Sequence, residues 1–208
     1  METNEIKKAI RHGAMRLIKG AEILTELDSQ TGDGDHGLTM TKIANELIHF
    51  CDEQEPLTVA DLFSGLAEAV LQVNGGSIVS LWAEMLFGAA DALGEKKSLE
   101  RSDLAVIVDG AIDGIGTISK AAPGDKTLLD TLLAVKTVCE EFPGREQFWA
   151  LVGSAAEAGA ESTRAMPAKY GRAKQLLDGS IGFLDPGAVS MSMFICGIAE
   201  YIGEKHAE

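Results

Sequence analysis

The sequence predicts an all-α fold, with eight helices arranged as an antiparallel up-and-down barrel or bundle. Apolar residues recur at three- and four-residue steps through most of the chain, which is the helical period. They make up 46% of the 208 residues, whereas aromatic residues make up only 5%. Such an aliphatic composition suits close-packed helices. Most joints between the periodic segments are short, which makes consecutive helices antiparallel neighbours.

The first half of the chain contains four predicted helices. The first has Ile6, Ile10, Leu17 and Leu24 on one face and gives way to a polar, glycine-rich stretch. Proline and a capping threonine open the third, and an Asn-Gly-Gly-Ser run separates it from the fourth. The four predicted helices cover residues 4–27, 38–51, 58–73 and 78–93.

Four more helices are predicted in the second half. Ser102 and Asp103 can cap the fifth, and Pro-Gly pairs precede the sixth and seventh. Pro186 starts the last helix, after an irregular stretch over 167–187. The four cover residues 104–120, 126–142, 144–166 and 186–203. Without a repeat or an internal linker, one domain over 1–208 is expected.

Charge and cysteine content exclude several classes of protein. The net charge of −14 argues against a general binder of nucleic acid or anionic membranes. The cysteines Cys51, Cys139 and Cys196 are far apart and outside any CxxC pattern, so buried thiols are expected rather than a disulfide or zinc site. No apolar run has the length of a signal peptide or membrane span. A cytoplasmic location is therefore expected.

The polar stretch after the first helix gathers three carboxylates, Asp28, Asp33 and Asp35. Carboxylates this close repel one another, and a divalent cation such as Mg²⁺ or Ca²⁺ would relieve the repulsion. An EF-hand is excluded, because position twelve of its loop would be Thr39 or Ala44 instead of glutamate. The spacing leaves a second interpretation open, in which Asp33 or Asp35 only caps the next helix.

Two other polar positions have alternative interpretations. His36 follows the carboxylates at a helix start, where it could donate to a phosphate or bond only to its own backbone. Asp125 and Lys126 follow the break at Pro123 and Gly124. In the interpretation without a functional role, Asp125 caps the next helix and Lys126 is solvated.

Six short motifs, in this order, resemble the nucleotide-binding subunit of dihydroxyacetone kinases, which also occurs as the C-terminal domain of single-chain ATP-dependent enzymes. Each motif is unspecific alone, but the ordered set spans nearly the whole chain. The resemblance implies a barrel of eight antiparallel helices with the nucleotide at one end. The motifs are GDGDHG at 32–37, GGS at 75–77, PGDKTLLD at 123–130, GRA at 171–173, SIG at 180–182 and DPGA at 185–188.

The resemblance also implies the ligands. Asp28, Asp33 and Asp35 would coordinate two Mg²⁺ ions that bridge the phosphates of ADP or ATP. The helix start at 36–39 would abut the phosphates, and the other groups would clamp a phosphate, line the base pocket or meet the nucleoside. The implied nucleotide contacts are His36, Gly37, Leu38, Thr39, Gly75, Gly76 and Ser77, then Arg172 as the phosphate clamp, Leu128 at the base, and Asp185 and Gly187 at the nucleoside.

One loop departs from the family pattern. After the third helix the family usually has GGASGPL, with a serine near the phosphates, whereas this chain reads GGSIVSLW. Ile78 and Val79 stand where the family has serine and glycine, and branched side chains resist the backbone angles that glycine permits. Ser77 or Ser80 would then supply the hydroxyl. Altered nucleotide exchange, or another ketose substrate, is consistent with this change.

The implied activity is phosphoryl transfer to dihydroxyacetone or a related ketose, in glycerol metabolism. The sequence shows no obvious nucleophile or complete sugar site, and the family holds the ketose on a separate subunit. A ketose-binding subunit is therefore the expected partner. A phosphoenolpyruvate-dependent system adds a phosphotransferase-system phosphodonor and keeps ADP bound as a cofactor, whereas an ATP-dependent system exchanges ATP. A homodimer stays open, as do two alternatives: a nucleotide-sensing regulatory protein and a helical scaffold.

Overall fold

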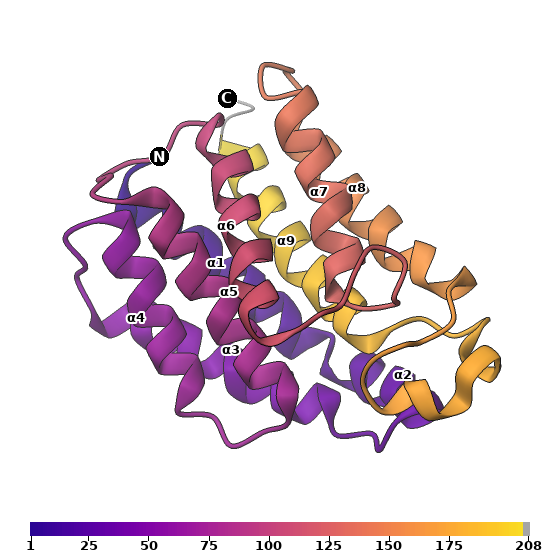
Figure 1. The fold of residues 1–208 in the computed structure, drawn as a ribbon. Coiled ribbons are helices and arrows are strands. Elements are labelled where there is room, and N and C mark those ends of the chain that lie inside the picture. The colour runs from indigo at the N-terminus through magenta and orange to yellow at the C-terminus, as the bar shows by residue number, and fades with distance from the viewer. Residues whose placement is uncertain (206–208) are drawn as a thin grey trace.

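The computed structural model describes residues 1–205, and this part of the chain is all-helical, as predicted (Figure 1). It contains nine α-helices, two 3-10 helices and no strand. Within the same range, no helix is long and apolar enough to cross a bilayer. The α-helices are α1 (Thr3–Lys19), α2 (Ala21–Thr31), α3 (His36–Glu53), α4 (Val59–Leu71), α5 (Ser77–Leu93), α6 (Asp103–Ile118), α7 (Leu128–Glu141), α8 (Phe148–Ser162) and α9 (Pro186–Lys205).

Eight of these helices form a closed ring in which each packs against its two neighbours. The order around the ring is α1, α3, α4, α5, α6, α7, α8 and α9, with α9 returning to α1 (Figure 1). Neighbours run antiparallel: Glu84 of α5 lies against Gly114 of α6, and Ala92, two turns later on α5, lies against Gly110. The predicted antiparallel helical barrel is therefore confirmed.

The predicted first helix, 4–27, is in fact two helices that meet at Gly20. A side chain at this position would overlap the Met193 sulfur on α9, so glycine permits the close approach of α9. The apolar period continues through the break, which is why the sequence did not reveal it. As a result α2 leaves the ring and packs on α3.

The segment 163–185, called the strap below, joins α8 to α9. It was predicted to be irregular from residue 167, and it contains two 3-10 helices, η1 (Thr163–Ala165) and η2 (Arg172–Ser180). The seventh predicted helix therefore ends at Ser162 rather than near Met166. In Figure 1 the orange strap lies beside α2, and η2 contacts that helix.

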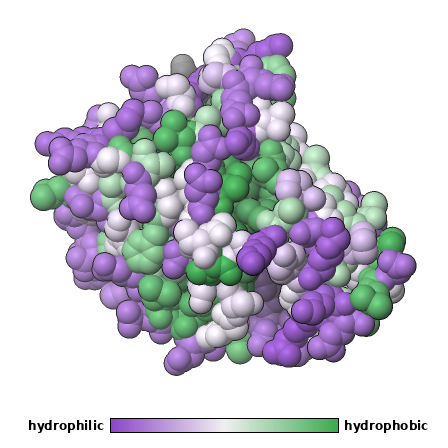
Figure 2. Space-filling model, in the orientation of Figure 1, coloured by the Kyte–Doolittle hydropathy of each residue, from purple (hydrophilic) through white to green (hydrophobic). Residues whose placement is uncertain are grey.

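The apolar faces of the ring helices meet in one interior core. Trp82, Phe148 and Leu17 are fully buried there. The core encloses an apolar cavity of about 150 Å³, which side chains of α6 and α7 help to line. Hydrophobic surface is visible from outside in the gap between these two helices (Figure 2). The three thiols are buried and free, as predicted.

Candidate functional site

A cleft of about 780 Å³ lies at one end of the barrel, where α3, α5, α7 and α9 all begin. These four helices alternate around the ring, so they point the same way (Figure 1). Their first residues, His36, Ser77, Leu128 and Pro186, all line the cleft. The unpaired N–H groups and positive dipole ends of four helices therefore meet at one space, which favours an anionic ligand.

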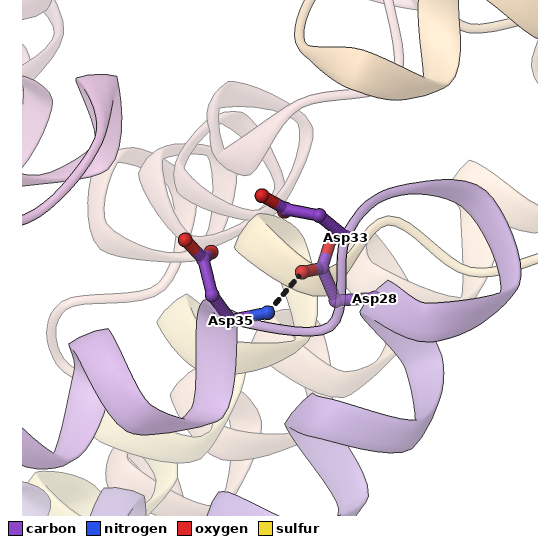
Figure 3. A group of neighbouring side chains, drawn as sticks. All are labelled: Asp28, Asp33 and Asp35. Atoms are coloured by element: carbon purple, nitrogen blue, oxygen red, sulfur yellow. Dashed lines mark hydrogen bonds between the residues drawn. The ribbon is translucent and has the colours of Figure 1, made fainter.

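The carboxylates of Asp28, Asp33 and Asp35 gather at the rim of this cleft. One oxygen from each lies within 4.8 Å of the others, and all three surround a common space (Figure 3). The loop that brings them together depends on two glycines. A side chain on Gly32 would overlap the Asp28 carboxylate, and Gly34 has a left-handed φ of 75°.

The structure also separates the roles of the three aspartates. Asp28 Oδ2 accepts hydrogen bonds from the backbone N–H groups of Asp35 (3.0 Å) and His36 (3.2 Å), so Asp28 satisfies the start of α3. Asp35 occupies the N-cap position, but its side chain makes no capping hydrogen bond. Helix capping therefore does not explain why Asp35 faces the cleft.

The donor set fits a divalent cation. Three carboxylates supply hard oxygen ligands, and the ion pair between Arg172 Nη2 and Asp33 Oδ2 (2.6 Å) offsets only part of their charge. Within residues 1–205, no other group of three or more Asp, Glu, His or Cys side chains is close enough to hold a metal ion. Oxygen-only ligands favour Mg²⁺ or Ca²⁺ over the metals that prefer nitrogen or sulfur.

His36 is buried in the floor of the cleft and connects α3 to α9. Its Nε2 lies 3.0 Å from Ser190 Oγ, and the Ser190 hydroxyl donates to the Gly187 carbonyl (2.9 Å). Burial lowers the pKa of His36, against smaller opposing effects of Asp28 and Asp35. A neutral imidazole follows, and its contact with a phosphate remains a prediction.

Asp185 also lines the cleft and directly precedes α9. Its Oδ2 accepts the Ala188 N–H (2.7 Å), so it caps that helix. Desolvation raises the pKa of Asp185 to about 7, although the Ala188 N–H and the Lys126 charge act in the opposite direction. This carboxyl therefore titrates close to neutral pH, which is unusual for an aspartate.

Ten of the predicted site residues line the cleft, and four do not. Gly37 and Gly75 instead permit close packing: a side chain on Gly37 would overlap the Ala21 carbonyl of α2, and one on Gly75 would approach Thr39. Thr39 itself is buried, whereas Leu38 is 59% exposed. The ten that line the cleft are Asp28, Asp33, Asp35, His36, Gly76, Ser77, Leu128, Arg172, Asp185 and Gly187.

The divergent loop lies directly at the cleft. Ile78 lines it, as do the two serines that could replace the missing hydroxyl, Ser77 and Ser80. Val79 is buried and packs against Gly75. The branched residues are accommodated because they lie within the regular helix α5.

Several lining residues were not expected from the sequence. Lys126 was interpreted as solvated, but it is 2% exposed and lines the cleft. Its place within PGDKT was the available signal. Tyr170 on the strap and the apolar pair Ile115 and Ile118 at the end of α6 also line the cleft. The sequence around these three residues does not predict that they line the cleft, because only the packing of α6 and the strap brings them there.

Comparison with known proteins identifies the family. Residues 30–200 match the DAK2 domain. The chain belongs to this family. It is 28% identical over 178 residues to the ADP-binding subunit DhaL of PEP-dependent dihydroxyacetone kinase 1 from Listeria innocua, covering 86% of each chain. The corresponding Escherichia coli subunit is 31% identical, with 82% of this chain and 83% of that subunit covered.

Larger relatives contain a similar segment. Human triokinase/FMN cyclase is 34% identical over 87% of this chain, which spans 32% of that protein. The crystal structure of the dihydroxyacetone kinase of C. freundii (native form) superposes over 96% of this chain and 34% of its own, with a TM-score of 0.75 and 24% identity. The same kinase with AMP-PNP and Mg²⁺ gives a TM-score of 0.69. These two structural superpositions support the all-helical fold described above.

Proposed function

We propose that this chain, as one domain over 1–208, is the ADP- or ATP- and Mg²⁺-binding subunit of a kinase for dihydroxyacetone or a related ketose. The observation that carries the proposal is the cluster of Asp28, Asp33 and Asp35 at a cleft where four helices begin. A metal–nucleotide complex matches this arrangement, because the carboxylates hold the cations and the helix starts hold the phosphates.

Each wall of the cleft suits one part of a nucleotide. The three aspartates would hold Mg²⁺, which neutralises phosphate charge during phosphoryl transfer. Arg172, on the strap, supplies a guanidinium for a phosphate oxygen. The apolar side chains of Leu128, Ile115 and Ile118 suit a flat base, as apolar walls do in most ligand pockets. Asp185, which also lines the cleft, can accept from a ribose hydroxyl.

The acceptor sugar would come on a partner. Phosphoryl transfer needs the acceptor hydroxyl held in line with the phosphorus, and the two subunit relatives are by name single subunits of a dihydroxyacetone kinase. We therefore include a ketose-binding subunit in the proposal. A homodimer is not part of it, since the relatives' names give it no support.

The two subunit relatives are PEP-dependent by name, and each is covered over more than four-fifths of its length. Their similarity supports the version in which ADP stays bound as a cofactor and a phosphodonor subunit of the phosphotransferase system rephosphorylates it. Native mass spectrometry of the purified protein tests this version directly. Co-purified ADP with magnesium is expected, and a chain that exchanges ATP freely and retains no ADP would favour the ATP-dependent version.

The partner requirement has its own test. The isolated chain should not phosphorylate dihydroxyacetone, and a cognate ketose-binding subunit should restore activity. Phosphorylation by the highly purified chain alone, lost in Asp35→Ala, would refute the two-subunit account and leave the metal site intact.

One observation favours a second candidate, a nucleotide-sensing protein without turnover. Ile78 lines the cleft where the family has a serine near the phosphates. The apolar side chain offers no hydrogen bond to a transferring phosphoryl group. Tight nucleotide binding without turnover, even with a ketose-binding subunit present, would support this alternative. If an Ile78→Ser variant gains turnover, Ile78 is the cause of the missing phosphoryl transfer.

A further inference from the structure

Lys126 combines two unfavourable features at one position. Its side chain is 2% exposed, although it carries an ammonium group. Its backbone has a left-handed φ of 62°, and within residues 1–205 only one other non-glycine residue, Leu177, has a positive φ. A buried charge and a left-handed side-chain-bearing residue each cost free energy, so packing alone is a poor explanation for lysine here.

The ammonium joins the two ends of the strap. Lys126 Nζ donates to the carbonyl of Thr163 (2.6 Å) and to the carbonyl of Phe183 (2.5 Å). Between these points the strap is closed on itself, because Arg164 and Gly182 exchange backbone and side-chain hydrogen bonds. Lys126 therefore holds both ends of a closed loop, which we call the base of the strap, rather than a single segment of chain.

The preceding residue holds the strap at a second point. Asp125 forms an ion pair with Lys169 (2.6 Å), and the Lys169 backbone N–H donates to the Asp125 carbonyl (3.2 Å). Lys126 is also followed directly by Thr127, whose side chain caps α7. Two adjacent residues thus attach the strap to the helix start that lines the cleft beside the predicted base site.

The strap carries Arg172 and Tyr170 into the cleft lining. Its own structure is weak, since η2 is a 3-10 helix interrupted at Leu177 by a φ of 50°. Arg172 is 67% exposed by side chain and contacts the rest of the cleft through Asp33. The position of its guanidinium therefore depends on how the base of the strap is held.

The charge environment agrees with this role. Both hydrogen-bond acceptors of Lys126 are neutral carbonyls. Desolvation lowers its pKa, the Arg164 charge lowers it further, and the Asp185 carboxylate opposes both. The lysine charge also acts on Asp185, another residue that lines the cleft, and lowers the pKa of that carboxyl against the larger effect of desolvation.

We propose that Lys126 is a positioning residue for the nucleotide: its ammonium fixes the base of the strap to the start of α7, and so presents Arg172 to the cleft. The identity of the ligand rests on the proposed function above. A methionine at this position would fill a similar volume without making either hydrogen bond, so Lys126→Met isolates the ammonium from the packing.

The test compares Lys126→Met, Lys126→Arg and the control Lys174→Met. Lys174 is an exposed lysine of the same strap that does not line the cleft, so its replacement removes one positive charge and leaves the anchor intact. Calorimetry should show that Lys126→Met lowers the affinity for Mg-ADP by about tenfold or more, which is the effect expected for the loss of one charged hydrogen bond. Partial recovery is expected in Lys126→Arg and a change below about twofold in Lys174→Met.

Two readouts separate positioning from general stability. Hydrogen exchange in Lys126→Met should accelerate across 163–185 and stay unchanged in α1 to α6. The variant should still bind Mn²⁺ without nucleotide, as followed by electron paramagnetic resonance, because all three carboxylates remain and none of them contacts the strap base. Should Lys126→Met not fold, Lys126→Gln takes its place, since its amide can still donate to one carbonyl.

Unchanged Mg-ADP affinity in a folded Lys126 variant would overturn the proposal, and so would faster exchange spread evenly over the barrel. Failure of the wild-type chain to bind Mg-ADP would instead contradict the proposed function. In that case the exchange measurement still decides whether Lys126 anchors the strap.

Discussion

At the end of the barrel opposite the cleft, polar groups find partners close by. Thr58 and Asp61 form a reciprocal capping box at the start of α4. At the start of α6, Asp103 accepts from the Glu100 N–H and pairs with Lys96 (2.6 Å). These contacts satisfy helix ends and charges locally.

At the cleft end the same kinds of group are arranged differently. Asp28, Asp33 and Asp35 lie together, and Arg172 is the cation paired with one of them. The backbone differs as well. Seven described residues have a left-handed φ, and all but Gly94 belong to loops at the cleft end: Gly34, Gly124, Lys126, Gly171, Leu177 and Gly182. Concentrated like charge, and a left-handed backbone at Lys126 and Leu177, are costs that a ligand site explains.

The largest expected effect tests the charge cluster itself. Asp33→Ala or Asp35→Ala should abolish Mg²⁺-dependent nucleotide binding, because each leaves the cation without a hard ligand beside charged phosphates. Calorimetry with Mg-ADP measures this. Unchanged affinity in both variants would show that these carboxylates do not form a metal site. The functional difference proposed between the two ends of the barrel would then be wrong.

Ligand binding should also stabilise the fold. Mg-ADP at 100 times its dissociation constant is expected to add about 2.7 kcal/mol to the free energy of unfolding by mass action. Thermal melts with and without Mg-ADP measure the shift, and Asp35→Ala serves as the control that should not respond. A wild-type melting temperature that does not rise at saturating ligand would contradict the binding site.

A smaller effect concerns pH. Because the folded-state pKa of Asp185 is raised to about 7, the stability contributed by its protonated form is lost as pH rises through that value. Asp185→Asn cannot ionise, so its melting temperature relative to wild type should be higher at about pH 8.5 than at about pH 5.5. Relative to wild type, the same variant should bind Mg-ADP more weakly at the higher pH, where the wild-type carboxylate can accept from a ribose hydroxyl. A melting-temperature difference independent of pH would contradict the raised pKa.

The smallest effect should come from the opposite end. Thr58→Ala removes the cap of α4 and should lower the free energy of unfolding by about 1 kcal/mol, measured by urea denaturation. Mg-ADP affinity should stay unchanged, because the capping box lies at the end of the barrel away from the cleft. Loss of affinity in this variant would mean that the two ends are not independent.

The sequence located the carboxylate loop correctly because its residues are close in the chain. Asp28, Asp33 and Asp35 fall within one loop, and the cluster in the structure contains these three. It could not distinguish a metal ligand from a helix cap, since that depends on where each side chain points. The structure gives the capping role to Asp28, which also belongs to the cluster.

Other positions needed contacts between distant segments. The helix break at Gly20 follows from the approach of Met193, which an apolar period cannot reveal. Lys126 was expected in solvent, because its acceptors, the carbonyls of Thr163 and Phe183, lie 37 and 57 positions away. Leu38, predicted beside the phosphates, is instead exposed outside the cleft lining.

By itself the sequence determined the all-helical class, the antiparallel barrel and the carboxylate loop, because helical period, short joints and local charge spacing are properties of neighbouring residues. Only the tertiary structure decided which helix starts meet at the cleft, how the strap is attached and which lysine is buried. Those features arise when the ring closes and the strap packs against the start of α7, and their energies come from partners that are remote in the chain.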